Sequence, residues 1–181
     1  FQSYLGWANQ KSERVGLHIM AVASKPGYGW IEFIKHEECK DNTDARLYYF
    51  RLGYLTSLVY SINGVDIFFE NLVASGNQPV IVDLETMFHT SLEGFKPSGP
   101  KITLQNRLFE SVAGIGILPQ PGMGSTDTEL FDVSVMGAKA DAKAPYKVTG
   151  IENFGNSKMR ITEIAGWIPE SNASPEHTLS R

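Results

Sequence analysis

The chain contains one cysteine, no long hydrophobic run and no large excess of either charge. Cys39 cannot form an internal disulfide, which fits a reducing compartment, and we expect a cytoplasmic protein. No apolar run approaches the roughly 20 residues of a membrane span. The net charge of −4 gives no strong field for nucleic acid. The opening segment FQSYLGWANQ has neither an initial Met nor the pattern of a signal peptide, as expected of a piece of a longer protein.

What is present is typical of a soluble α+β domain. Apolar residues make up 42% of the 181 residues and charged residues 20%, which is enough to build a core. Residues 1–11 are expected to be the end of a helix. The apolar, β-branched runs 15–23 and 28–34 flank the turn signal Lys25-Pro26-Gly27. They predict a β-hairpin over residues 15–34.

The strongest helical pattern covers residues 43–62. Apolar residues recur at steps of four and three and form one stripe, at Tyr48, Leu52, Leu55, Val59 and Ile62. Asp41, Asn42 and Thr43 offer side chains that can cap the helix N-terminus. Asn63 and Gly64 tolerate the left-handed conformation that commonly ends a helix.

Short strands and several weaker elements are expected after this helix. A loop over 65–72 leads to strands at 72–75 and 79–85, which a turn at Gly76-Asn77-Gln78 joins. Weaker patterns then predict a loop at 92–100, a helix from about 102 to Val112, a connection at 119–128, strands at 130–136 and 158–168, and a frayed end after residue 170.

Asp66, Asn71 and Asp83 are the residues that most clearly suggest chemistry. Kinase-type phosphoryl transfer needs a base beside the attacking hydroxyl, and an Asn and an Asp to hold Mg²⁺ on the phosphates. Asp83 interrupts an apolar run, and a buried carboxylate is costly unless a partner such as a metal ion compensates for it. The alternative is that all three have local roles, in turns and at a strand end.

Three segments carry a resemblance to a known family: YGWIEFIKHEEC (28–39), YYFRLGYLTSLVYSINGVDIFFEN (48–71) and QPVIVDLETMFH (78–89). The later segments LFESVAGIGILP (108–119), DVSVMGA (132–138) and ENFGNSKMRI (152–161) fit the same pattern. Together they resemble the dehydratase domain of type 2 lanthionine synthetases, the LanM family. The similarity runs over most of the chain.

The resemblance implies a lipid-kinase-like (protein-kinase-like) fold and an enzyme that uses ATP and Mg²⁺. Such enzymes phosphorylate Ser and Thr of a ribosomally made precursor peptide with a leader, and then eliminate the phosphate to leave dehydro amino acids. The resemblance implies that Asp66 is the catalytic-loop Asp, that Asn71 and Asp83 are metal ligands, and that Glu85 is the Glu of the DLET segment. Glu70 belongs to the same motif. A C-terminal zinc cyclase domain is expected in the parent protein.

The same resemblance predicts how the chain is divided. Residues 1–36 are expected to form part of an N-lobe-like β region, and residues 37–181 a helical catalytic-loop and metal-binding lobe that is incomplete at both ends. A hinge is expected near 35–41. The family's phosphate-contacting Lys lies upstream of Phe1, and its Arg and Thr for phosphate elimination lie downstream. The isolated chain is therefore expected to give little or no dehydration.

One position departs from the family pattern. The family usually has His two residues after the catalytic Asp, and this chain has Phe68. A phenyl ring cannot shuttle a proton as imidazole can. Two alternatives to an active dehydratase stay open: a degenerate, non-catalytic kinase-like module that binds nucleotide or peptide, and an unrelated α+β domain whose acidic residues are structural.

The remaining candidate residues are assigned to packing or to the surface. The aromatic residues Trp7, Tyr28, Trp30 and Phe33 are expected in the core, although the backbone of YGWIEFI can also meet an adenine edge in a kinase-like fold. The scattered His18, His36, His89 and His177 form no metal motif. The segment PGMGS (121–125) lacks the Lys of a phosphate-binding loop.

Overall fold

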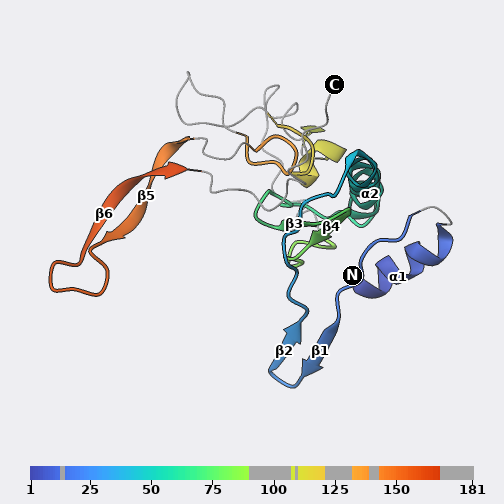
Figure 1. Ribbon diagram of the computed structural model, residues 1–181, viewed down its shortest axis with the longest axis horizontal. Coiled ribbons are helices and arrows are strands. Elements are labelled where there is room, and N and C mark those ends of the chain that lie inside the picture. The colour runs from blue at the N-terminus through green and yellow to red at the C-terminus, as the bar shows by residue number, and fades with distance from the viewer. Residues whose placement is uncertain (13–14, 90–106, 109, 121–131, 139–142, 168–181) are drawn as a thin grey trace.

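The computed structural model describes residues 1–12, 15–89, 107–108, 110–120, 132–138 and 143–167. In chain order its elements are α1 (Gln2–Lys11), β1 (Val22–Lys25), β2 (Tyr28–Ile31), α2 (Asn42–Ser61), β3 (Leu72–Ser75), β4 (Gln78–Ile81), the 3₁₀ helix η1 (Val112–Ile115), β5 (Lys143–Glu152) and β6 (Arg160–Trp167). The strands pair as three antiparallel hairpins, β1–β2, β3–β4 and β5–β6 (Figure 1). None of the helices in these described ranges is long and apolar enough to cross a membrane. The fold is thus a mixture of helix and small antiparallel sheets, and its kinase-like class stays a prediction.

Helix α2 is the central support of the fold, and its predicted apolar stripe is confirmed. Four of the five stripe residues are buried: Tyr48, Leu52, Leu55 and Val59. Asp41 is the N-cap, because its Oδ1 accepts hydrogen bonds from the backbone N–H groups of Thr43 (2.8 Å) and Asp44 (2.9 Å). The chain turns out of the helix at Asn63, which has a positive φ of 54°.

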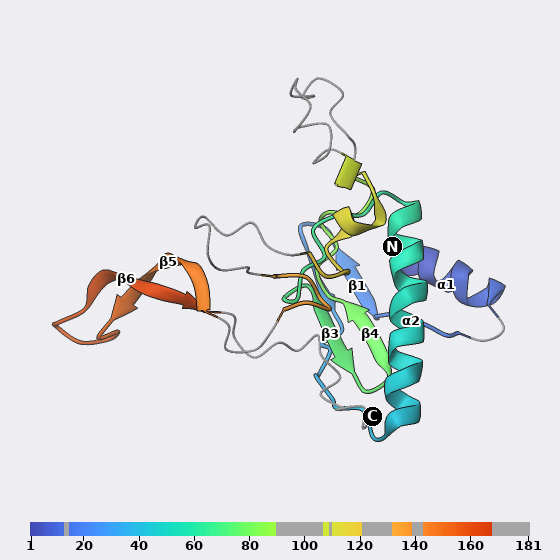
Figure 2. The same ribbon diagram turned by 90° about the horizontal axis from the view of Figure 1, so that it is seen from above.

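The β3–β4 hairpin lies along α2 (Figure 2). Its register runs from Leu72 opposite Ile81 to Ser75 opposite Gln78, so the first predicted strand is confirmed in full. Asn77 in the turn donates to Asp44 Oδ1 (2.7 Å), and Arg51 Nη1 donates to the Asn77 backbone oxygen (3.0 Å). This side-chain network ties the tip of the hairpin to the N-terminal half of α2. The hydrogen bond from Asn77 is also the main reason why the pKa of Asp44 lies below its ordinary value.

One buried apolar cluster joins α1, the segment after it, α2, the β3–β4 hairpin and η1. Its residues are Leu5, Ala8, Val15, Leu17, Cys39, Ala45, Tyr48, Leu52, Leu55, Leu58, Val59, Ile67, Leu72, Ala74, Ile81, Ile115, Ile117 and Val135. Burial of such side chains is the main favourable term in folding. The cluster draws on both sides of the predicted division after residue 36, and that division stays a prediction.

The β1–β2 hairpin is shorter than predicted, because residues 15–21 do not form a strand. Side-chain amides bond the backbone of this segment instead of a neighbouring strand. Asn9 both accepts from Leu17 N–H (2.9 Å) and donates to the Leu17 oxygen (2.8 Å). Gln78 accepts from His18 N–H (3.1 Å). The apolar, β-branched run predicts a strand, but these contacts hold the segment as an irregular connection against the core.

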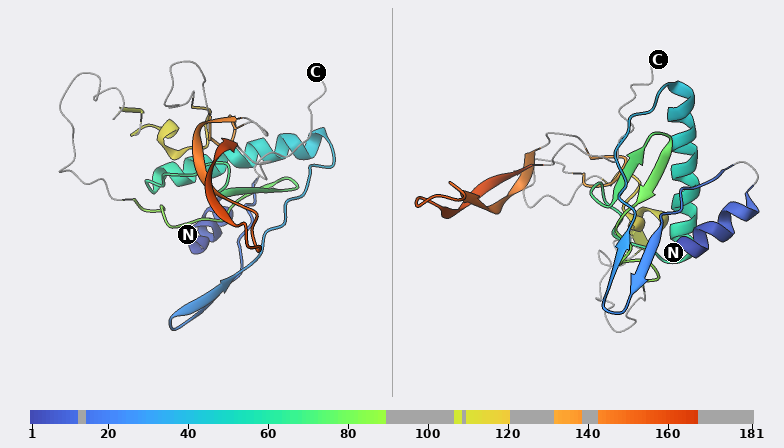
Figure 3. Two further views of the ribbon diagram at one scale, coloured as in Figure 1. Left: turned by 90° about the vertical axis from the view of Figure 1, so that its left-hand side faces the viewer. Right: turned by 60° about the horizontal axis from the view of Figure 1, so that its bottom comes forward.

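The expected burial of four aromatic residues is wrong. The exposed fractions are 53% for Trp7, 61% for Tyr28, 60% for Trp30 and 88% for Phe33. Tyr28 and Trp30 contact each other edge to face, with ring centroids 5.0 Å apart. The β1–β2 hairpin projects away from α2 and β3–β4 (Figures 1 and 3), so the rings of Tyr28 and Trp30 contact each other rather than the core.

The second half of the chain departs most from the sequence-based expectations. Of the helix expected from about 102 to Val112, residues 107–108 are helical, residues 102–106 and 109 lie outside the described residues, and Val112 begins the 3₁₀ helix η1. In the described part of the strand expected at 130–136, Ser134 forms an isolated antiparallel bridge with Phe68 and no strand. Strand β6 agrees with the strand expected at 158–168, whereas its partner β5 was not predicted. The predictions for 92–100, 121–128 and the end after residue 170 lie outside the described residues, as do PGMGS and His177.

Candidate catalytic and metal-binding loop

The loop over residues 65–71 begins where α2 ends. Gly64 donates its backbone N–H to the Val59 oxygen (2.9 Å), which closes the end of the helix. A Cβ at Gly64 would lie 2.6 Å from Val59 Cγ1 and 3.1 Å from Met87 Sδ. Glycine is therefore required here by close packing, and the packing sets the direction in which the loop leaves the helix.

The loop is fixed to two later segments through its backbone. Ile67 N–H donates to the Ile115 oxygen (2.7 Å), and Phe69 N–H donates to the Val133 oxygen (3.1 Å). The Ile67 side chain is completely buried. Ile67 thus packs into the core, whereas its neighbours Asp66 and Phe68 line a pocket.

Asp66 and Asn71 are held in one closed turn. Asp66 has a φ of 63°, a left-handed conformation that Asp tolerates better than most residues. Asn71 Nδ2 donates to the Asp66 backbone oxygen (2.8 Å), and Asn71 N–H donates to the Phe68 oxygen (3.0 Å). The Asp66 side chain is exposed and that of Asn71 is half-buried. The turn therefore presents the Asp66 carboxylate to solvent and orients the Asn71 amide.

Asp83 lies beside this turn because of the register of the β3–β4 hairpin. Leu72 pairs with Ile81, and the next residue pair continues the ladder, with Val82 N–H donating to the Asn71 oxygen (2.9 Å). Asp83 follows directly. The structure therefore brings the Asp66–Asn71 turn and Asp83 together at the open end of the hairpin, at the level of the backbone.

The expectation that Asp83 interrupts a buried strand is wrong. Strand β4 ends at Ile81, and the side chains of Asp83 and Glu85 are exposed. Asp83 Oδ1 accepts a hydrogen bond from Glu85 N–H (3.3 Å), and Glu85 begins a turn. Because the Asp83 carboxylate is exposed, it needs no metal ion to compensate for burial. The assignment of Asp83 as a metal ligand must therefore rest on the oxygen atoms that Asp83 and Asn71 offer.

Thr86 helps to hold the loop in place, and the sequence analysis did not predict this role. Its hydroxyl donates to the Val65 oxygen (2.5 Å), and Val65 N–H in turn reaches the Thr86 oxygen (3.4 Å). These bonds join the start of the loop over residues 65–71 to the segment that carries Asp83 and Glu85. The only sequence signal was the position of Thr86 next to Glu85 in the quoted DLET segment.

A pocket of about 550 Å³ opens beside the loop. It is lined by Asn63, Val65, Asp66, Phe68, Thr86, His89, Glu110 and Gly114. Of the four predicted site residues, only Asp66 is in this lining. Asn63 and His89 form one edge through hydrogen bonds between Asn63 Nδ2 and the His89 oxygen, and between His89 N–H and the Asn63 oxygen. The volume is typical of small-molecule sites.

The donor atoms fit a magnesium ion that also binds phosphate. Asn71 uses its Nδ2 as a donor, which leaves Oδ1 as the atom to face a cation. Asp83 contributes an exposed carboxylate nearby. Mg²⁺ commonly takes one or two carboxylates and completes its shell with water and substrate phosphates. In the ranges that the structure describes, no three His, Cys, Asp or Glu side chains gather closely enough to hold a metal ion.

Two further predicted positions have structural roles. Cys39 is buried in the core and donates its Sγ–H to the Gly76 oxygen (3.3 Å), and burial is the main cause that raises the pKa of its thiol. His18 lies 3.2 Å from Glu32 Oε2 in an exposed pair. Cys39 thus has a packing role, and the packing or surface role expected of His18 is confirmed.

Comparison with known proteins identifies the family. Residues 1–179 match the family described as "domain of unknown function (DUF4135)", and the chain belongs to that family. Over 100 residues the chain is 35% identical to the lacticin 481/lactococcin biosynthesis protein LcnDR2 of Lactococcus lactis subsp. lactis. The aligned stretch makes up 54% of this chain and 11% of that relative. The two matches confirm the resemblance to part of a type 2 lanthionine synthetase.

Proposed function

We propose that the chain is part of a lanthionine synthetase dehydratase that phosphorylates Ser and Thr of a precursor peptide with ATP and Mg²⁺, and then eliminates the phosphate. The observation that carries the proposal is the closed turn of Asp66 and Asn71 beside Asp83, joined by the Asn71–Asp66 and Val82–Asn71 hydrogen bonds. The similarity to a lantibiotic biosynthesis protein supports the choice of substrate.

In this proposal Asp66 is the base. Its exposed carboxylate at the pocket can accept the proton of a peptide hydroxyl. The hydroxyl oxygen then bonds to the γ-phosphorus of ATP, the bond from that phosphorus to the β-phosphate oxygen breaks, and ADP leaves. Loss of phosphate together with the Cα proton of the modified residue then gives the dehydro amino acid.

Asn71 and Asp83 are the proposed metal ligands. Asn71 Oδ1 and the Asp83 carboxylate would hold Mg²⁺, which when bound neutralises charge on the phosphates. Glu85 lies two residues further on, and its backbone N–H fixes the Asp83 carboxylate. We propose Glu85 as a supporting acid of the same site. The same proposal includes three further points: the substrate is a precursor peptide with a leader, the protein is cytoplasmic, and a longer parent protein carries a C-terminal zinc cyclase domain.

The proposal is tested on Asp83 in the full-length protein that contains this chain. Asp83→Asn removes one charge from the metal shell and should lower the rate of precursor phosphorylation by about 10² or more, while the circular dichroism spectrum stays unchanged. Glu38→Gln is the matched control, since Glu38 is an exposed carboxylate outside the loop. The readout is the mass gain of the intact peptide with ATP and Mg²⁺. A near wild-type rate in Asp83→Asn would remove Asp83 from the metal site.

Phe68 favours a second candidate, a non-catalytic module that binds nucleotide or peptide. The Phe68 ring lies against Gly116, where a Cβ would come within 3.1 Å of Phe68 Cδ1. The ring thus has a packing role at a position where the family usually has His. Nucleotide binding without any phosphate transfer to the precursor would favour this second function over the first.

A further inference from the structure

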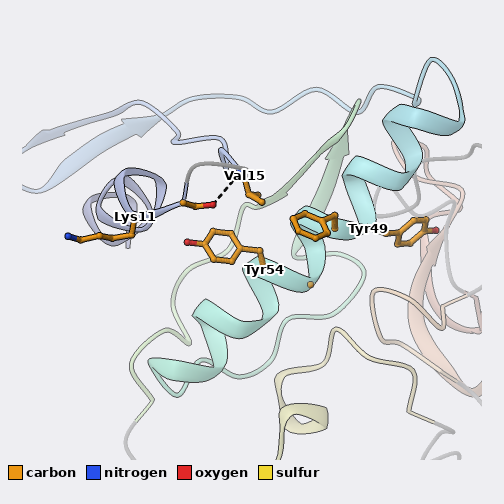
Figure 4. Close-up of a pocket in the computed structure, with 7 residues that line it drawn as sticks. Lys11, Val15, Tyr49 and Tyr54 are labelled. Carbon is orange, nitrogen blue, oxygen red and sulfur yellow. Dashed lines mark hydrogen bonds between the residues drawn. The ribbon is translucent and has the colours of Figure 1, made fainter.

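Two large hollows in the described part of the chain differ in their chemistry. One occupies about 700 Å³ between α1 and α2, and Figure 4 shows Lys11 and Tyr54 among the residues that line it. Its described lining residues include neither a carboxylate nor an imidazole. The other hollow is the pocket of about 550 Å³ described above, and its lining includes both, at Asp66 and His89. Of the two, only the second combines groups that commonly act as general acids and bases.

The backbone of His89 is fixed at the edge of this pocket. Its N–H donates to the Asn63 oxygen (3.1 Å), and Asn63 Nδ2 donates to the His89 oxygen. Both polar backbone groups of His89 are thereby paired, whereas its imidazole makes no hydrogen bond to another described residue, and the residue is exposed. Asn63 lies just after the end of α2, three residues before Asp66. One helix end therefore positions both His89 and Asp66.

The residue before His89 is held in an unfavourable backbone conformation. Phe88 has a φ of 59°, in the left-handed region that bulky residues rarely adopt. Its side chain is 57% exposed, so burial of the ring gives little in return. Strain of this kind persists only where the surrounding contacts enforce it, and it is concentrated at functional sites. Here the two hydrogen bonds between Asn63 and His89 enforce it, so the fold holds His89 at the pocket in spite of the strain at Phe88.

The proposed reaction needs a base at each of its two steps. Phosphorylation removes the hydroxyl proton of Ser or Thr, and elimination removes the proton on Cα. The hydroxyl oxygen and Cα are both bonded to Cβ, so a substrate residue that stays in the pocket needs both bases around it. A proton on carbon is less acidic than one on oxygen, and an imidazole, much of which is unprotonated near neutral pH, is a stronger base than a carboxylate. His89 carries the only imidazole among the described lining residues, and it is therefore the group suited to the second step.

We propose that His89 is the catalytic base of the elimination step, an assignment that rests on the proposed function. An imidazole nitrogen takes the proton from Cα of the phosphorylated residue, whose phosphate group carries one proton. The electron pair of the broken C–H bond forms the Cα=Cβ double bond, the Cβ–O bond breaks, and hydrogen phosphate leaves with the electrons of that bond. His89 then gives its proton to the solvent, to which the residue is exposed. Asp66 thus serves the first step and His89 the second.

The test starts from the phosphorylated intermediate, so that it does not depend on phosphoryl transfer. The full-length protein that contains this chain is mixed with precursor peptide synthesised with one phosphoserine, in the presence of ADP and Mg²⁺, and mass spectrometry follows the loss of phosphate. His89→Gln keeps a polar side chain but removes the base, and it should slow this loss by about 10²–10⁴. His18→Gln is the matched control, because His18 pairs with Glu32 outside the lining of this pocket, and it should change the rate by less than about twofold.

Chemical rescue distinguishes a base from a structural residue. Added imidazole should restore part of the elimination rate of His89→Ala and should leave the rate of His18→Gln unchanged. With unphosphorylated precursor and ATP, His89→Gln should accumulate phosphopeptide that the wild type converts. Normal elimination by His89→Gln, or a loss that imidazole does not restore in His89→Ala, overturns the assignment of His89. A wild type that eliminates phosphate from the phosphopeptide but never phosphorylates the precursor defeats the proposed phosphorylation and leaves the assignment of His89 intact, whereas a wild type that does neither defeats both.

Discussion

Gly116 offers the sharpest test of how the loop over residues 65–71 is positioned. It has a φ of 95°, and a Cβ there would lie 2.8 Å from the Ile67 oxygen and 3.1 Å from Phe68 Cδ1. Alanine in a left-handed conformation costs about 1–2 kcal/mol. The contact with the Ile67 backbone requires a shift that adds about 1–3 kcal/mol. Gly116→Ala should therefore lower the free energy of unfolding by about 2–5 kcal/mol, and the Tm by about 4–20 °C for a chain of this length.

Gly53→Ala is the matched control for this prediction. The substitution is the same, but the new Cβ meets open space at an exposed position of α2. It should raise the free energy of unfolding by up to about 1 kcal/mol, because alanine is the better helix former. Thermal and urea unfolding followed by circular dichroism measure both variants. A Gly116→Ala protein as stable as the wild type would refute the claim that contact with Gly116 fixes residues 67 and 68.

Three further predictions follow from named contacts. Phe68→His in the full-length protein should speed precursor phosphorylation by about 10²–10⁴ with little change in ATP affinity, and an unchanged rate would favour the non-catalytic function. The pKa of Glu32 is lowered from its ordinary value of 4.5, first by the hydrogen bond from Ala21 N–H and then by the one from His18. Ionised Glu32 therefore contributes fully to the stability of the protein above about pH 4.5, and this contribution is lost as the pH falls through the lower pKa of the folded state. In Glu32→Gln the free energy of unfolding should depend less on pH over that range. Thr86→Val removes the hydrogen bond to the Val65 oxygen and should lower the free energy of unfolding by about 1 kcal/mol in urea, whereas no loss would show that this bond does not anchor the loop.

The sequence predicted the elements whose signals are local. The stripe of α2, the Asp41 cap and the Asn63–Gly64 end depend on residues within one or two turns, and all three agree with the structure. The first strand of the β3–β4 hairpin was likewise predicted from the turn signal Gly76-Asn77-Gln78 between apolar runs. The juxtaposition of the Asp66–Asn71 turn with Asp83 followed from that hairpin and from the quoted family pattern.

The failures concern contacts between distant segments. Residues 15–21 look like a strand, but the side chains that bond their backbone come from as far away as Gln78. The exposed aromatic hairpin could not be foreseen, because composition does not say which apolar residues project from a fold. Asp83 appeared buried because periodicity does not mark the end of a strand. The role of Gly116 depends on its contact with Ile67, nearly fifty positions earlier, which no local pattern reports.

The β5–β6 hairpin extends from the rest of the fold as an arm (Figures 1 and 2). Its strands pair from Lys143 opposite Trp167 to Glu152 opposite Arg160, and it makes no extensive contact with another described element. Its hydrogen bonds can therefore open without disturbing the core. Amide hydrogen exchange in the arm should report only this local opening, with equal rates in the wild type and in Gly116→Ala, while exchange at Ile67 should accelerate in the variant. The exchange rates in the arm would thus serve as an internal reference, and loss of protection in the core can be measured against them within one sample.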